Sequence, residues 1–367
     1  MRKHYSMYGN NRENKRKERR FFSSPTVSAI VKIVAVGIFT LSLAISTMLI
    51  IFIIIGVAAV AGNGADRSYA GYQKYYIDEH EPSFKSEFAT EIAVIQISGI
   101  ITEYDQRGTL LQYIENPVDG VKNRLDVIRT DENVYGVLLV VDSPGGGVTA
   151  SDVLFNHVMR FREETGIPVV TFMKQVAASG AYYVAAASDA IIAYPTTITG
   201  SIGVIMYSFN FAGLMDKYGV EYVPVKTSDG KDSLSPFKPV DQREVEWMQA
   251  IVNQMLDRFI DAIDEGRENL SREDVVQLAD GRVYIATEAK KLGLIDHVGY
   301  FDDAVDLLAG LAGVKNPRLV EFEREMHFRD VIGRVRLHVP RSIIDERIMR
   351  QGNLELYYIW DVFLRQR

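Results

Sequence analysis

A long apolar run near the start of the chain limits the possible folds more than any other feature. No charged residue occurs from Ile33 to Ala61, and an apolar helix needs only roughly 20 residues to cross a bilayer. The run therefore predicts one transmembrane helix over residues 33–61. Its last residues, Ala59 to Ala61, also resemble the cleavage site of a secretion signal. A cleaved signal peptide is the alternative, although its apolar core is about half as long as this run.

The charges on the two sides of the run predict its orientation. Residues 1–32 contain nine Lys and Arg against Glu13 and Glu18, whereas the first charge after the run is Asp66. Since the cytoplasmic flanks of membrane helices carry an excess of Lys and Arg, we expect residues 1–32 to form a basic cytoplasmic arm. The chain after Gly62 then lies outside the cytoplasm.

The remaining composition excludes several classes of protein. The 367 residues include no cysteine, which rules out disulfides, thiolate metal sites and a cysteine nucleophile. Residues 33–367 carry 32 Lys and Arg against 46 Asp and Glu, a net charge of −14. An acidic body of this kind argues against nucleic acid as a partner.

Changes in residue pattern divide the part of the chain that follows the apolar run. Residues 62–88 lack apolar periodicity and carry four tyrosines, which is typical of a juxtamembrane linker. A folded domain is predicted over residues 89–316. Residues 317–367 form a charged C-terminal tail that ends in the apolar stretch LELYYIWDVFL. The tail could dock on the domain or on a partner.

Strand-like and helix-like segments alternate along the predicted domain, which indicates an α/β fold. The predicted strands cover residues 91–101, 135–143, 168–173, 190–195 and 221–227, and the predicted helices cover 118–130, 151–165, 181–188, a segment near Leu214, and 242–265. The last helix has an apolar face that includes Val245, Met248, Ile251, Val252, Met255 and Phe259. It is longer than one core usually requires, so we expect part of it to pack on a neighbouring subunit.

Two small-residue motifs could carry chemistry. In VVDSPGGGV, residues 140–148, the glycines allow a turn whose N–H groups are open to a ligand, as in an oxyanion hole, although most such stretches are only turns. In VAASGAYYVAAAS, residues 176–188, Ser179 follows a predicted strand and precedes a predicted helix. Small neighbours leave room for a substrate backbone beside a reactive serine. The alternative is a serine that caps a tightly packed helix.

A serine nucleophile needs a base within hydrogen-bonding distance. Among the six histidines, only His297 lies in the predicted domain outside an amphipathic helix. Lysine is the other candidate, because burial can favour its neutral amine. Lys231 follows a predicted strand among small polar residues, but the charge pattern does not distinguish it from Lys174, Lys226 or Lys238.

Five motifs occur together in one order: SPGGG, AASGAYY, TGSIGV, GKDSLSP, and ADGRVY with AKKLGLID. From about Ile92 to Gly313 the chain resembles the signal peptide peptidase A family, membrane-anchored serine peptidases with a Ser-Lys dyad. The resemblance implies that Ser179 is the nucleophile and Lys231 the general base. It also implies that the N–H groups of Gly146 and Gly180 form the oxyanion hole, and that the Ser201 hydroxyl orients the lysine.

The same resemblance implies a ClpP/crotonase-like fold of stacked ββα units and a ring-shaped homo-oligomer with sites that face an enclosed cavity. The expected substrates are hydrophobic peptides near the membrane, such as cleaved signal peptides, and no metal or cofactor is required. The tail after Pro317 matches nothing in the family pattern. Two alternatives are a crotonase-type enzyme that acts on acyl-CoA, and a membrane scaffold that has lost catalysis.

Overall fold

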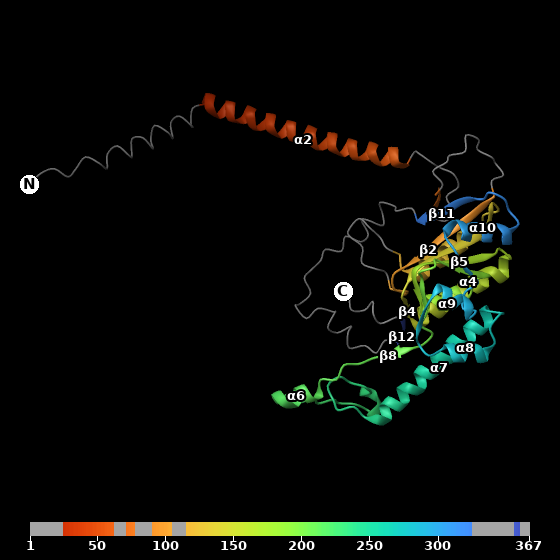
Figure 1. Cartoon of the computed structure of the whole chain (residues 1–367). Coiled ribbons are helices and arrows are strands. Elements are labelled where there is room, and N and C mark those ends of the chain that lie inside the picture. The colour runs from red at the N-terminus through yellow and green to blue at the C-terminus, as the bar shows by residue number, and fades with distance from the viewer. Residues whose placement is uncertain (1–24, 62–70, 78–89, 105–114, 325–355, 360–367) are drawn as a thin grey trace, which may run out of the picture. The chain divides into compact units, whose positions relative to one another are not determined.

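The computed structural model describes residues 25–61, 71–77, 90–104, 115–324 and 356–359. The chain divides into two compact units, Met1–Arg67 and Ser68–Arg367. In the first unit, helix α2 covers Pro25–Ala61 and includes the whole predicted apolar helix (Figure 1). Its segment Lys32–Ile51 has a mean hydropathy of 2.4, and within the described residues it alone is long and apolar enough to cross a bilayer.

The second unit is built on a mixed sheet. In spatial order its strands are β1 (Tyr72–Tyr76), β11 (Arg318–Arg324), β2 (Glu91–Ser98), β3 (Val134–Ser143), β5 (Val169–Ala178), β6 (Ala190–Ala193) and β10 (His297–Val298). Neighbours from β11 to β10 run parallel, and β1 is antiparallel to β11. The first half of β5 pairs with β6, whereas its second half pairs with β7 (Ile198–Gly200), which also pairs with β9 (Val283–Ile285). The sheet therefore divides at the end of β5.

A second, smaller sheet lies beside the glycine-rich motif. Strand β4 (Gly145–Gly147) and strand β8 (Ile205–Met206) both pair with β12 (Leu356–Ile359), which runs between them and antiparallel to each. Residues from the C-terminal part of the chain thus lie against a motif more than two hundred positions earlier.

Helices cover both faces of the main sheet, as alternation along β3 requires. The side chains of Val137, Leu139 and Val141 join a core with α3 (Pro117–Ile128), α4 (Val148–Thr165) and α5 (Gly180–Ala185). The intervening Leu138 and Val140 pack on the other face, against α10 (Phe301–Ala312). The other helices are α6 (Ala212–Tyr218), the 3₁₀ turn η1 (Asp229–Asp232), α7 (Gln242–Gly266), α8 (Arg272–Leu278) and α9 (Ala286–Lys291).

The mixed α/β class is confirmed, but the edge of the sheet differs from the prediction. Strand β1 lies inside the predicted linker 62–88, and β11 lies inside the predicted tail 317–367. Both are held by burial of one face, because Tyr72 and Phe322 are at most 5% exposed. The sheet therefore begins before residue 89 and continues past residue 316.

The predicted strand over residues 221–227 is wrong. Residues 221–226 have no regular structure, and all seven residues of the segment are exposed. Their β-branched and aromatic side chains favour a strand only where a neighbouring strand and a core face exist. Neither is present here among the described residues, so the β-propensity of these side chains alone does not produce a strand.

Candidate active site

Ser179 occupies the junction between β5 and α5. Its backbone angles, φ 57° and ψ −119°, lie in a region that L-amino acids rarely adopt. Two hydrogen bonds hold this conformation: the Ser179 N–H donates to the Gly200 carbonyl at 2.7 Å, and the Tyr183 N–H donates to the Ser179 carbonyl at 2.9 Å. Strained backbone of this kind persists only where the surroundings fix it, and it is concentrated at functional sites.

The small residues around Ser179 allow close packing of α5. Every residue of this helix is buried, including the rings of Tyr182 and Tyr183. At the end of α7, a Cβ placed on Gly266 would lie 2.0 Å from the Ala186 carbonyl oxygen, so this approach requires glycine. The helix is therefore tightly packed, but the Ser179 side chain makes no capping hydrogen bond, so the alternative of a capping serine is only half correct.

Ser201 lies beside Ser179. Strands β5 and β7 run parallel with Ala178 opposite Gly200, and each serine is the next residue after its strand. Ser201 also has a positive φ, 53°, and its N–H donates to the Arg282 carbonyl at 2.8 Å. Among the described residues neither hydroxyl makes a recorded hydrogen bond, so both are available to a further group.

Gly146 is fixed by the segment that precedes the predicted helix 118–130. The Ile101 N–H donates to the Gly145 carbonyl at 3.0 Å, and the Gly147 N–H donates to the Ile101 carbonyl at 2.9 Å. Because backbone groups alternate along a strand, the N–H of Gly146 points to the opposite side, where β12 pairs with it through Tyr358. A Cβ on Gly146 would lie 2.0 Å from the Ile101 oxygen.

Four predicted site residues therefore gather at one end of β5. Ser143 is opposite Ala177 in the β3–β5 ladder, which brings the glycine motif alongside the approach to Ser179. As the first residue of α5, Gly180 has no intrahelical acceptor for its N–H. A buried serine, two glycine amides and a second serine are groups that can carry out acyl transfer if a base joins them.

Lys231 lies in different surroundings. It belongs to η1, within a segment from residue 203 to 243 in which no residue is buried. We call residues 203–243 the exposed arm; in Figure 1 its helix α6 and the start of α7 lie away from the sheets. No hydrogen bond between Lys231 and Ser179 is recorded within this chain.

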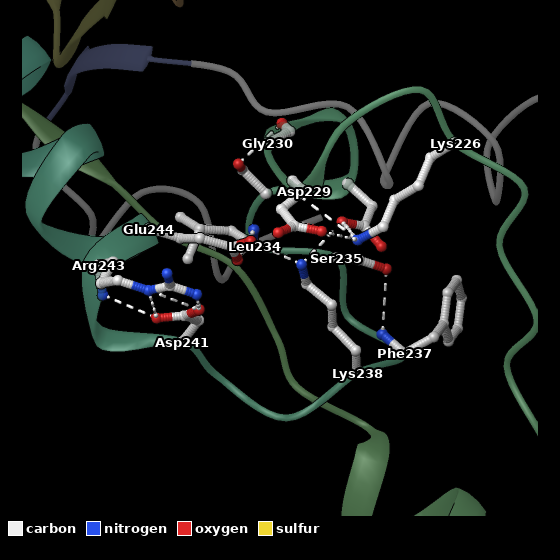
Figure 2. Close-up of polar contacts among 12 residues, drawn as sticks. Lys226, Asp229, Gly230, Leu234, Ser235, Phe237, Lys238, Asp241, Arg243 and Glu244 are labelled. Atoms are coloured by element: carbon white, nitrogen blue, oxygen red, sulfur yellow. Dashed lines mark hydrogen bonds and ion pairs between the residues drawn. The ribbon is translucent and has the colours of Figure 1, made fainter.

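The structure distinguishes three of the four lysines of the exposed arm, Lys226, Lys231 and Lys238. Lys226 and Lys238 both donate to one oxygen of Asp232, at 2.7 and 2.8 Å, and Lys238 also donates to Glu244 at 2.7 Å (Figure 2). These hydrogen bonds, first from Lys226 and then from Lys238, hold the pKa of Asp232 below its usual value. Among the described residues the Lys231 amine has no recorded partner.

Sequence reasoning missed Asp232 and Glu244. The signal for Asp232 was its place among four charges of both signs, Lys226, Asp229, Lys231 and Lys238. Which of them pair depends on the turn at η1, and the spacing alone does not specify it. The burial of Glu244, 3% exposed on the first turn of α7, has no signal in the sequence.

His297 does not lie near Ser179. It is exposed on the edge strand β10, opposite Ile192 of β6, and Ile192 is itself opposite Phe172 of β5. Phe172 precedes Ser179 by seven residues, which corresponds to roughly 20 Å along a strand. The alternative in which His297 is the base therefore has no support in the geometry.

Comparison with known proteins adds a family match. The model of peptidase family S49 matches residues 162–315, a range that contains Ser179, Gly180, Ser201 and Lys231.

Similar proteins include three with related names. A relative from Methanocaldococcus jannaschii, named as a protease, is 41% identical over 203 residues, which are 55% of this chain and 64% of that protein. A relative from Enterococcus faecium, named as a signal peptide peptidase, is 34% identical over 235 residues, 64% of this chain and 67% of its own length. A chloroplastic serine protease of Arabidopsis thaliana is 31% identical over 201 residues, 54% of this chain and 29% of its own length. The match thus spans less than two thirds of the first and third of these relatives.

Proposed function

Because this chain belongs to peptidase family S49, the signal peptide peptidase A family, it is a serine-type peptidase, and we propose that Ser179 and Lys231 form its catalytic dyad. The observation that carries the proposal is the strained, buried Ser179 at the end of β5, beside Gly146, Gly180 and Ser201.

The proposed reaction is acyl transfer through an acyl-enzyme. The neutral amine of Lys231 takes the proton of the Ser179 hydroxyl, whose oxygen attacks the peptide carbonyl carbon. The N–H groups of Gly146 and Gly180 donate to the oxyanion, and Ser201 orients the lysine. The protonated amine then gives its proton to the leaving amino group. Water, deprotonated by the same amine, finally releases the acyl group from Ser179.

We propose that the dyad is completed between two copies of the chain. The exposed arm presents large apolar side chains to solvent, with Phe209 71% and Val223 77% exposed. Trp247, on the first half of α7, is 50% exposed. Apolar surface of this extent is typical of an interface. A neighbouring copy that covered the arm would bring Lys231 to a second Ser179, and repetition around a symmetry axis would close a ring.

The smaller sheet supports an extended peptide as substrate. Strand β12 lies antiparallel to both β4 and β8, next to the amide of Gly146. A peptide that took this position would add a strand to the two edges by backbone hydrogen bonds, a mode of recognition that is largely independent of sequence. We propose that hydrophobic peptides such as cleaved signal peptides are hydrolysed here, and that β12 occupies the same position when no substrate is bound.

Helix α2 supports a single-pass membrane anchor. The nine Lys and Arg of residues 1–32 support a cytoplasmic N-terminus and an extracytoplasmic peptidase domain. An anchor would concentrate the enzyme and membrane-derived peptides on one surface. Protease treatment of intact cells tests the orientation: we expect the domain to be digested, and its protection would contradict the proposed topology.

The division of β5 between two pairing partners supports a ClpP/crotonase-like fold for the peptidase domain.

The dyad and its sharing are tested by two inactive variants. Ser179→Ala and Lys231→Ala should each reduce hydrolysis of an unfolded apolar peptide by about a thousandfold or more while the protein stays folded. When the two variants are mixed and allowed to exchange subunits, activity should return, because a site with both intact residues can form. Full activity of Lys231→Ala alone would overturn the dyad. No recovery in mixed oligomers would show that both residues act within one chain.

A further inference from the structure

We infer that Lys226 and Lys238 are positioning residues that keep the Lys231 amine free of a carboxylate partner. The inference rests on the proposed function, in which Lys231 is the general base. Two acidic residues, Asp229 and Asp232, belong to the same turn as Lys231. Either carboxylate could stabilise a protonated amine beside it and so remove the base from the reaction.

The Asp232 carboxylate is held by two other lysines, whereas the Asp229 side chain is 89% exposed and is only approached by Lys226. Lys226 Nζ lies 2.7 Å from Asp232 Oδ1 and 3.9 Å from Asp229 Oδ1, and it also donates to the Asp229 carbonyl at 3.5 Å. Lys238 Nζ approaches the same Asp232 oxygen at 2.8 Å. The amines of Lys226 and Lys238 thus converge from two parts of the arm (Figure 2).

Glu244 fixes this arrangement to α7. One of its oxygens accepts from Lys238 at 2.7 Å, and the other accepts the Leu234 N–H at 3.1 Å. The Glu244 side chain is only 4% exposed, so the ion pair with Lys238 is shielded from solvent. These contacts raise the pKa of Lys238, first through Asp232 and then through Glu244. Lys238 therefore stays charged and attached to both carboxylates.

Helix α7 lies beside the turn, with Trp247 next to Gly230. On the first turn of this helix, Arg243 binds Asp241 at 2.7 Å. Asp232 retains one buried oxygen, Oδ2, without a hydrogen-bond partner in the described part of the chain. If Lys226 and Lys238 lost their charges, Asp232 would lose both of its recorded cation partners, and the adjacent Lys231 would be the cation left in its turn.

The experiment uses the full-length protein and its peptidase activity against pH. In the double variant Lys226→Met and Lys238→Met, the freed Asp232 should hold the proton on Lys231, so activity at neutral pH should fall about tenfold or more. The activity should recover as pH rises, with the ascending limb displaced upward by about one pH unit, which equals that tenfold change. The control is Lys315→Met, an exposed lysine that follows α10 and lies outside the exposed arm, which should leave the profile unchanged.

A third substitution separates electrostatics from folding. Adding Asp232→Asn to the double variant removes the freed carboxylate, so the limb should return most of the way to its original position. If the profile stays displaced, or if the double variant loses activity equally at all pH values, the lysines only stabilise the arm and the inference is wrong.

A second readout does not depend on catalysis. In the inactive Ser179→Ala background, brief treatment with acetic anhydride at a series of pH values labels neutral amines, and mass spectrometry resolves each lysine. Lys231 should label faster than Lys226 and Lys238 near neutral pH, and its labelling should slow in the double variant. Equal labelling of the three lysines would overturn the inference. If the Ser179→Ala protein gives the expected labelling but the separate Lys231→Ala variant keeps full peptidase activity, the proposed function alone is overturned.

Discussion

The surroundings of Ser179 and of Lys231 differ in the way they are held. Around Ser179 every residue of α5 is buried, and the backbone is fixed by adjacent strands and by glycines that admit no Cβ. Around Lys231 no residue from 203 to 243 is buried, and hydrogen-bonded charges replace an apolar core. The first region is complete within one chain. The second exposes apolar side chains that the described residues of one chain leave uncovered.

This difference suggests how the activity could be controlled. In the proposed mechanism, the Ser179 nucleophile is fixed by its own core in every folded subunit, whereas the Lys231 base on the exposed arm is placed only when a neighbour supports the arm. Activity would then depend on assembly, and unassembled subunits would leave other proteins intact.

Substitutions in the glycine motif test the buried region around Ser179. Gly146→Ala should lower activity by about a hundredfold or more and unfolding free energy by about 2 kcal/mol, because its Cβ would lie 2.0 Å from the Ile101 oxygen. Gly147→Ala is the matched control, since its nearest neighbour would be 3.7 Å away and its φ of −62° suits any residue. Peptide hydrolysis measures the activity of each variant, and thermal unfolding measures its stability. Equal effects of the two substitutions would contradict a specific role for Gly146.

Substitutions of exposed apolar residues test whether the exposed arm forms an interface. The pair Phe209→Ser and Val223→Ser should change subunit stability by less than about 0.5 kcal/mol, because both side chains are exposed in one chain. Assembly should weaken about tenfold or more, and activity should fall with it, as sedimentation and peptide assays would show. Leu311→Ser, an exposed leucine of α10, should leave both unchanged. Full assembly of the arm variant would contradict the proposed interface.

Strand β12 tests whether the proposed peptide position is filled from within the chain. Removal of residues 355–367 should raise kcat/KM for a short peptide about threefold or more, because an attached competitor acts at high effective concentration. Removal of residues 362–367 alone retains β12 and should have no effect. Unchanged kinetics in the longer truncation would show that β12 and the substrate occupy different positions.

Acid should loosen the exposed arm through Asp232. Its pKa is lowered in the folded protein, so its contribution to stability is complete near neutral pH and is lost as pH falls below the usual aspartate range, through the lowered pKa. Relative to the intrinsic exchange rate at each pH, the protection of the Leu234 and Ser235 amides from hydrogen exchange should fall there, whereas the protection of Ala186, in the core around α5, should change less. Protection of the arm amides that does not depend on acid would contradict the role of the Asp232 contacts.

Much of the fold was predictable because the strands of the main sheet have strong local patterns. The stretches that form β2, β3 and β5 are continuous apolar runs, as parallel buried strands require. Strands β1 and β11 were not predictable in the same way, since each has one exposed face and gains its partner from the other end of the domain. The predicted strand over residues 221–227 was wrong for the opposite reason: the local pattern favours a strand, but the described part of the chain provides no partner strand.

The sequence by itself determined the apolar helix, the α/β class and the motifs that contain Ser179, Gly146, Gly180 and Ser201, since these depend on composition and local pattern. Only the tertiary structure decided that these four residues meet at the end of β5, that Asp232 binds Lys226 and Lys238, and that β12 lies beside β4. Such contacts join positions far apart in the chain or depend on the geometry of a single turn. These contacts are stabilised by packing and by charge pairs between residues that no single short stretch of sequence contains together.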